Sequence, residues 1–135
     1  MTLPQAPSVT RLSDPMDLTD FGAPQAYKGW LIICHQDVDV SVFDDAAAMA
    51  DNTLPMAARK TAMENWIMAI VAEWNFVTTE NRPVLDASGQ PTGQFLQVVK
   101  SLPQPSDGGA RYCRQELLPA ITQAFAKAIQ TNPNS

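Results

Sequence analysis

The clearest periodic pattern in the chain is the stretch Ala57-Ala-Arg-Lys-Thr-Ala-Met-Glu-Asn-Trp-Ile-Met-Ala-Ile-Val-Ala-Glu-Trp-Asn-Phe76. Its large apolar residues fall at the i, i+3, i+4, i+7, i+8 and i+11 positions of one helix face: Met63, Trp66, Ile67, Ile70, Val71 and Trp74. Four charged residues lie on the opposite face: Arg59, Lys60, Glu64 and Glu73. At 1.5 Å per residue such a helix is about 30 Å long, enough to cross a small domain. The pattern therefore predicts a central core helix over 57–76.

The segment before this helix has the pattern of a β-hairpin. Gly29-Trp-Leu-Ile-Ile-Cys34 is an apolar run of strand length, and three valines then alternate with polar residues over 37–42. We expect the connection at 35–37 and the valines on one face. Because a lone two-stranded hairpin is marginal in water, that face needs a cover. A short alanine-rich helix over 45–51, capped by Asp44, is expected to supply part of it.

The segments after the long helix are expected to be helical as well. Asp86-Ala-Ser-Gly89 is typical of a turn, and residues 95–102 have apolar residues at helical spacing. A final helix carries apolar residues at helical spacing from Leu117 to Ile129. Pro119 either bends this helix or lies in the first turn of a separate helix that begins near Leu117.

The fold class expected from these patterns is α+β and mostly helical. It comprises an N-terminal arm, one β-hairpin, and three to four helices around a single core. Residues 1–26 contain four prolines and no regular period, which predicts the arm. Residues 27–130 are expected to form one α+β domain, and the polar residues 131–135 a flexible tail.

Composition narrows the function classes. The chain has 135 residues, of which 45% are hydrophobic and 17% charged, as expected for one folded domain. Its net charge of −5 means that the chain lacks the excess of positive charge typical of proteins that bind nucleic acid or an anionic membrane, so neither is an expected partner. Cys34 and Cys113 have no metal-ligand spacing, and the first residues lack a signal-peptide pattern, so we expect reduced thiols and a cytoplasmic location.

The residues needed for catalysis are scarce. His35, the one histidine, is expected at a turn with no readable partner. The carboxylates Asp37, Asp39, Asp44 and Asp45 are close in sequence but match no cation-binding loop. We therefore expect no catalytic, metal-binding or cofactor-binding residue, and no enzymatic activity.

A resemblance to a known family runs over residues 60–130, and more loosely over 28–50. The long helix ends in Ala72-Glu-Trp-Asn-Phe76, a polar connection with Gly89 and Pro91-Thr92 follows, and the chain closes on the Ala/Ile-rich stretch from Leu117 to Ile129. This order resembles the tail assembly chaperones of long-tailed bacteriophages. Residues 106–114 form an insertion relative to the pattern, and Ala87-Ser88 replaces the acidic residue expected beside the turn.

The resemblance implies a non-catalytic protein of the infected host cytoplasm. Such a chaperone binds the tape measure protein, helps to recruit tail tube subunits, is usually absent from the finished particle, and is often also made as a frameshift-extended form. We expect partner-binding residues among Trp74, Asn75, Phe76 and Trp30, and leave self-association open. The alternative is a structural particle component, such as a head-tail connector or minor tail protein, whose arm at 1–26 orders on assembly.

Overall fold

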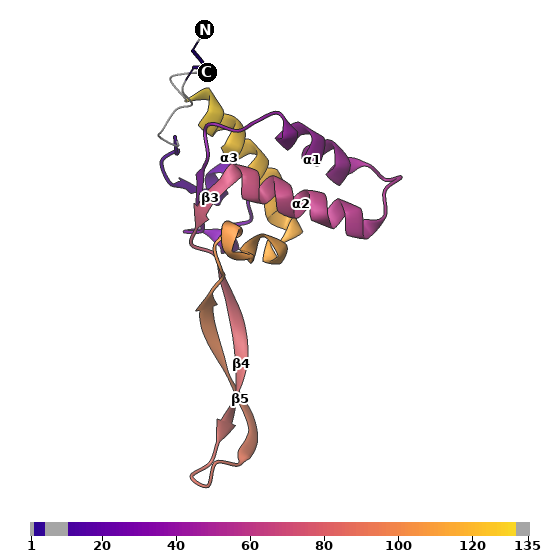
Figure 1. Cartoon of the computed structure of the whole chain (residues 1–135). Coiled ribbons are helices and arrows are strands. Elements are labelled where there is room, and N and C mark those ends of the chain that lie inside the picture. The colour runs from indigo at the N-terminus through magenta and orange to yellow at the C-terminus, as the bar shows by residue number, and fades with distance from the viewer. Residues whose placement is uncertain (1, 5–10, 132–135) are drawn as a thin grey trace.

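The structure is a computed structural model that describes residues 2–4 and 11–131. Within those residues it contains three α-helices and five strands, drawn in Figure 1. The elements are β1 (Met16–Asp17), β2 (Leu31–Cys34), α1 (Ser41–Ala50), α2 (Met56–Ile70), β3 (Val71–Trp74), β4 (Val77–Leu85), β5 (Pro91–Ser101) and α3 (Leu118–Gln130). Short 3-10 helices occupy 18–21, 25–27, 105–107, 109–112 and 115–117.

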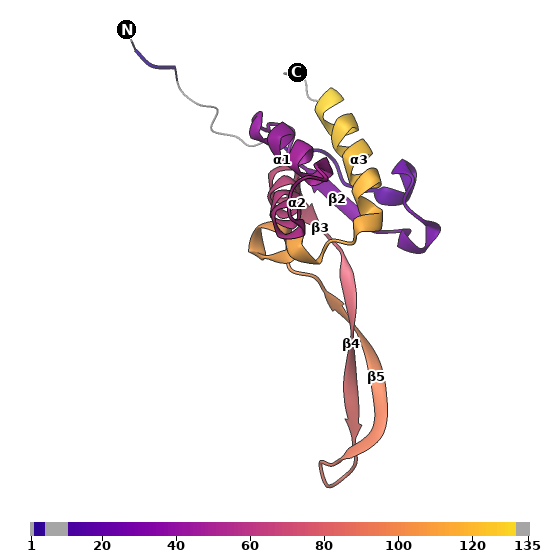
Figure 2. The same ribbon diagram turned by 90° about the vertical axis from the view of Figure 1, so that its right-hand side faces the viewer.

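A small antiparallel sheet lies at the centre of the helical body. Its strand order is β1-β2-β3, with Ile32 of β2 opposite both Met16 and Trp74. α2 packs against β3 and α3 against β2, and Figure 2 shows α3 on one side of the body with α1 and α2 on the other. The largest fully buried side chains come from all of these parts: Leu18, Ile32, Val42, Ile67, Ile70, Val71, Phe76, Leu117 and Ile121. One core thus joins the sheet to the helices.

The predicted core helix is confirmed up to Ile70 and is wrong beyond it. Val71 adopts extended backbone angles (φ −102°, ψ 114°), and the chain continues as β3. Ile70 and Val71 are both β-branched, which favours a strand, and β3 pairs with β2. Trp74 is therefore buried as a strand residue rather than as the last turn of a helix.

The predicted hairpin over 29–42 is also wrong. β2 is present, but its partners are β1 and β3 rather than residues 38–42. Asp39 Oδ1 accepts a hydrogen bond from Ser41 N (2.9 Å), and this turn leads directly into α1. Val42 is consequently buried from a helix, and the helix predicted over 45–51 is found with an earlier start.

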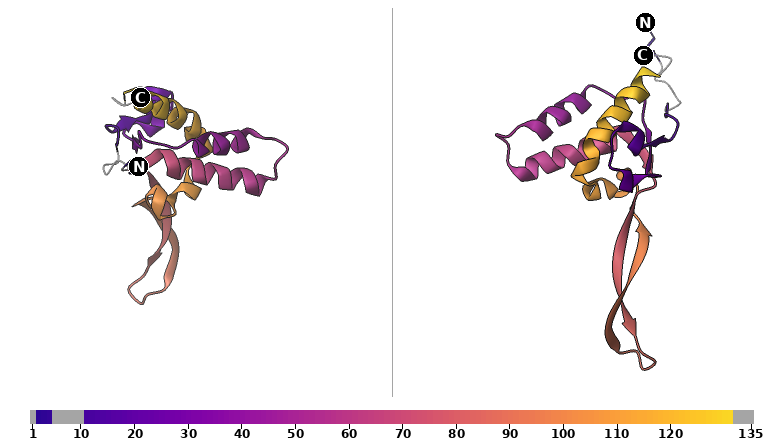
Figure 3. Two further views of the ribbon diagram at one scale, coloured as in Figure 1. Left: turned by 45° about the horizontal axis from the view of Figure 1, so that its top comes forward. Right: turned by 180° about the vertical axis from the view of Figure 1, so that it is seen from behind.

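The helix predicted over 95–102 is wrong, because this segment is strand β5. It pairs with β4 in a second antiparallel sheet, with Thr79 opposite Val99 and Pro83 opposite Phe95. The predicted turn at Asp86–Gly89 is confirmed: Gly89 N donates to Asp86 O (3.0 Å), and Gly89 has a φ of +84° that suits glycine. Figures 1 and 3 show this hairpin projecting away from the helical body.

Two sheets and a long hairpin correct the expected fold class. The fold is α+β, but it is not mostly helical, and its hairpin lies at β4–β5 rather than near residue 35. The alternative left open at Pro119 is settled in favour of a separate helix, since α3 begins at Leu118 with Pro119 in its first turn.

Part of the proline-rich segment 1–26 packs on the body. β1 pairs with β2, Leu18 is fully buried, and Ser13 N donates to Cys34 O (2.9 Å). Residues 1 and 5–10 of the expected arm, and residues 132–135 of the expected tail, lie outside the described residues.

Candidate partner-binding groove

Two adjoining cavities form a groove: the larger lies between α1 and α3, and the smaller between the first half of α2 and residues 111–118. Their volumes are about 490 Å³ and about 320 Å³, and Met49 of α1 lines both. One wall is a face of α3, with lining residues at Leu118, Thr122, Phe125, Ala126 and Ile129. These positions recur at helical spacing, so a single stripe of α3 faces the groove along most of its length.

The larger cavity is almost wholly apolar. Val42, Phe43, Ala46, Met49 and Ala50 of α1 line it opposite the α3 stripe, and Trp66 of α2 lines it as well. Thr122 is the one polar side chain among its described lining residues. Small alanines stand on both walls, at Ala46 and Ala50 of α1 and at Ala126 of α3. Phe43 also lines this cavity and is 66% exposed, so its ring presents apolar surface to the solvent.

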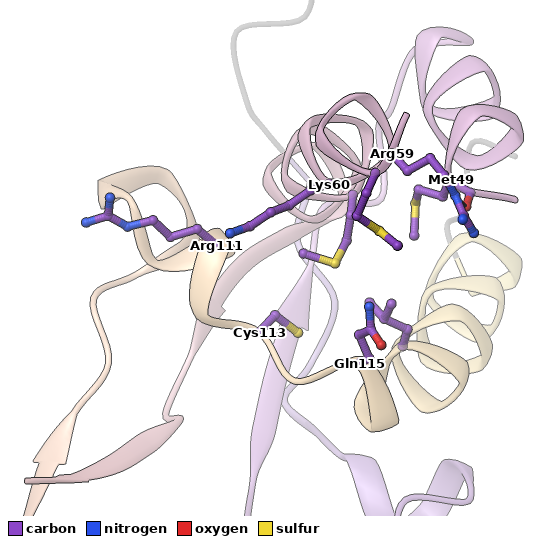
Figure 4. Close-up of a pocket in the computed structure, with 9 residues that line it drawn as sticks. Met49, Arg59, Lys60, Arg111, Cys113 and Gln115 are labelled. Atoms are coloured by element: carbon purple, nitrogen blue, oxygen red, sulfur yellow. Dashed lines mark hydrogen bonds between the residues drawn. The ribbon is translucent and has the colours of Figure 1, made fainter. Parts of the chain in front are cut away.

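The smaller cavity combines methionines with cations, as Figure 4 shows. Met49, Met56 and Met63 supply flexible apolar surface, and Arg59, Lys60 and Arg111 also line the cavity. The Arg111 side chain points away from the other labelled residues in Figure 4, and its guanidinium lies 4.7 Å from the Tyr112 ring. Arg59 Nε donates to the carbonyl of Met49 (3.1 Å), which fixes α2 to the end of α1. No carboxylate is among the described residues that line this cavity. The groove is therefore apolar at one end and basic at the other.

Cys113 lies in the basic half but is not arranged for nucleophilic chemistry. Burial raises the pKa of its thiol to about 12, as it does for the buried Cys34 thiol in the sheet. Both cysteines are free and protonated at neutral pH. The groove thus has the character of a binding surface rather than of a reactive site.

Three of the residues expected to contact a partner belong to an aromatic cluster. The Trp74 and Phe76 rings are stacked at 4.4 Å between centroids, and Trp30 lies 5.1 Å from Phe76. Trp74 is 4% exposed and Phe76 1%, while Trp30 is half-buried with the Arg114 guanidinium 5.9 Å from its ring. Trp74 Nε1 donates to Pro103 O (2.8 Å). The structure brings these residues together, and the contacts it gives Trp74 and Phe76 are internal.

Asn75, the fourth expected residue, joins two backbone segments. Its Oδ1 accepts from Leu31 N (2.7 Å), and its Nδ2 donates to Gly29 O (2.9 Å). The side chain therefore continues the pairing of β2 with β3 past the end of the strand. The asparagine of the Trp-Asn-aromatic motif therefore has a structural role, because it holds the backbone of residues 29–31 against the end of β3.

The other residues weighed for chemistry are dispersed. His35 forms a bridge with Leu12 and donates its backbone N–H to Ile70 O (2.9 Å), so it is not at a hairpin tip. Asp39 accepts the hydrogen bonds that begin α1. Over residues 2–4 and 11–131, no group of three or more His, Cys, Asp or Glu residues is placed to hold a metal ion.

The groove residues were not predicted as a site. Trp66 and Phe125 were expected in the core, and this is confirmed, since they are 5% and 8% exposed; they also line the larger cavity. Val42 was expected on a strand and lies in α1. Two features of the sequence could have indicated a binding surface. They are Phe43 directly before Asp44, a ring that the structure exposes, and three methionines within fifteen residues of one another. These residues become one surface only when α3 is placed opposite α1.

Comparisons with protein-family models, with curated proteins and with solved structures find no match for this chain. None of the helices that the structure describes has the length and apolar character required to cross a lipid bilayer.

Proposed function

We propose that this protein is a non-catalytic tail assembly chaperone of a long-tailed bacteriophage, which acts in the host cytoplasm and holds a segment of the tape measure protein. The observation that carries the proposal is the groove, with its apolar half between α1 and α3 and its basic half between α2 and residues 111–118. The resemblance over residues 60–130 supplies the identity of the partner.

The groove suits an amphipathic helix. α3 has 13 residues, so its wall is about 20 Å long and accommodates three to four turns of a bound helix. An apolar stripe at i, i+3, i+4 and i+7 would cover the exposed Phe43 ring and the small parts of Trp66 and Phe125 that remain accessible, 5% and 8% of these residues. Met49, Met56 and Met63 adapt to side chains of different shape, which a carrier of a long and varied partner requires.

The cations at one end give the bound helix a direction. Arg59, Lys60 and Arg111 favour acidic residues on the partner, and acidic residues are themselves most stable near a helix N-terminus. The bound segment would therefore place its N-terminal turn beside Lys60 and its C-terminal turn beside Phe43. The recruitment of tail tube subunits rests on the resemblance alone.

Co-expression with the tape measure protein of the same genome tests the proposal. We expect the partner to stay soluble and to co-purify with a tagged copy of this chain, whereas it should aggregate when expressed alone. A tape measure protein that neither binds this chain nor gains solubility from it would contradict the chaperone function.

A structural particle component remains a second candidate, and the projecting β4–β5 hairpin favours it. A long ribbon with uncovered faces is suited to contact neighbouring subunits in an assembly. Mass spectrometry of purified particles separates the two functions. A stoichiometric presence in mature particles would favour the structural component, and absence from them the chaperone.

A further inference from the structure

The β4–β5 hairpin carries large apolar side chains that the described parts of the chain do not cover. Leu85, Phe95, Leu96 and Val99 are between 55% and 67% exposed. The main contacts of the two strands are with each other, and the ribbon projects away from the helical body (Figure 2). Its ladder closes at the base where Leu102 N donates to Phe76 O (2.9 Å). A two-stranded ribbon of this length gains stability when a partner covers one of its faces.

The two faces of the ribbon differ in charge. Directly opposed residues share a face, so one face holds the pairs Val77/Ser101, Thr79/Val99, Asn81/Gln97 and Pro83/Phe95. This face, called here the neutral face, has no charged residue, and Leu85 continues its alternation along β4. The other face holds Lys100, Leu96, Val98 and the ion pair of Arg82 with Glu80 (3.4 Å). Charge is therefore confined to one side.

The edges of the ribbon are less suited to docking than the neutral face. Leu102 N donates to Phe76 O, so 76/102 is a hydrogen-bonded pair. Hydrogen-bonded pairs alternate along an antiparallel ladder, so 78/100 and 82/96 are hydrogen-bonded pairs as well. Pro83 falls on a pair whose backbone groups point outwards. Its missing N–H leaves the ladder intact and removes a donor from the outer edge, which disfavours strand addition.

The neutral face has apolar residues on both sides of its middle pair. On either side of Asn81/Gln97 stand Thr79/Val99 and Pro83/Phe95, and beyond these Val77 and Leu85. We infer that the neutral face packs against the same face of a second copy of this chain, with the two hairpins antiparallel and the two-fold axis crossing the Asn81/Gln97 pair. Phe95 of each copy then lies over Val99 of the other, and Leu85 over Val77.

The net charge of the chain and the area of the neutral face are both compatible with a second copy as the partner. Each copy carries a net charge of −5, so association is easiest through a face without charge and with the two bodies at opposite ends of the ribbon pair. The ribbon has eight paired positions along the nine residues of β4, so it is about 30 Å long and about 10 Å wide. Because side chains make the accessible area of each face larger than its flat outline, two such faces in contact bury on the order of 1,000 Å². This area is the lower limit for a specific interface. The dimer is accordingly a reversible one.

Sedimentation of the full chain over a range of concentrations tests the dimer, with two adjacent and similarly exposed residues as a matched pair. We expect a monomer–dimer equilibrium that Phe95→Glu on the neutral face weakens at least about tenfold, and that Leu96→Glu on the charged face changes less than about threefold. A wild-type chain that stays monomeric at the highest concentrations, or equal effects of the two substitutions, would overturn the inference.

Cross-linking tests the register without a buried substitution. Opposed sheets are about 10 Å apart, so a short bis-maleimide should join two copies of Asn81→Cys across the axis but not two copies of Arg82→Cys on the other face. The native Cys34 and Cys113 are 0% and 8% exposed and should give little background. Equal yields from the two variants would refute the antiparallel arrangement. The inference does not rest on the chaperone function, since both experiments use this chain alone.

Discussion

Trp74 joins the sheet to the segment that follows the hairpin through its backbone and its side chain. Gln104 bonds to both Trp74 N (3.0 Å) and Trp74 O (2.9 Å), and the indole Nε1 donates to Pro103 O (2.8 Å). Because the ring is 4% exposed, Trp74→Ala should lower the free energy of unfolding by about 3–5 kcal/mol. Trp74→Phe keeps a ring over Phe76 and should cost clearly less. Urea unfolding checks both, and an unchanged midpoint for Trp74→Ala would show that the ring is not in the core.

Asp17 should make the fold sensitive to acid. Hydrogen bonds from the Thr19 hydroxyl and from the backbone N–H groups of Thr19 and Gly29 lower the pKa of its carboxyl from 3.8 to about 2. Its contribution to stability is therefore complete above about pH 4 and is lost as the pH falls towards 2, because the unfolded chain binds the proton first. Urea midpoints over this range should fall less steeply for Asp17→Asn than for the wild type. An identical pH dependence in the two proteins would contradict this role.

At the scale of elements, the sequence predicted those segments whose pattern spans several turns and is buried on one side. This holds for most of 57–70 and for 118–130, where three or more turns share one apolar stripe. Residues 95–102 were too short for the helical and strand periods to be separated, and Phe95, Val99 and their neighbours fit both. The valines at 38–42 alternate like a strand, yet the turn at Asp39 starts a helix instead. The strand at 71–74 depends on pairing with β2, which no local pattern contains.

The hairpin should be dispensable for the stability of the helical body. Its exposed strands contribute little to the core, and the ladder closes at its base where Leu102 N donates to Phe76 O (2.9 Å). Replacing residues 79–99 by a short Gly-containing turn should therefore change the melting temperature by less than about 4 °C. Calorimetry of the shortened chain, at a concentration where the wild type is monomeric, makes the comparison. A much larger loss would mean that the ribbon supports the core.

At the scale of the whole molecule, the groove arises from helices that are distant in the chain. The α1 residues at 42–50 and the α3 residues at 122–129 line the same cavity. Periodicity could identify each apolar stripe, but it could not distinguish a stripe that packs from one that lines a groove. For the same reason three of the four expected partner-binding residues were taken from a motif, and Trp74 and Phe76 of that motif lie in the core.

The most direct test of the account is the affinity of the purified chain for a helical segment of its tape measure protein, measured for two neighbouring variants of α3. Thr122 and Gln123 are both exposed, but only Thr122 lines the groove. Thr122→Glu places a charge where the partner's apolar stripe must lie and should weaken binding at least about tenfold. Gln123→Glu adds the same charge outside the groove and should change the affinity less than about threefold. Binding that survives Thr122→Glu, or that both substitutions weaken equally, would contradict the groove as the site that holds the tape measure protein.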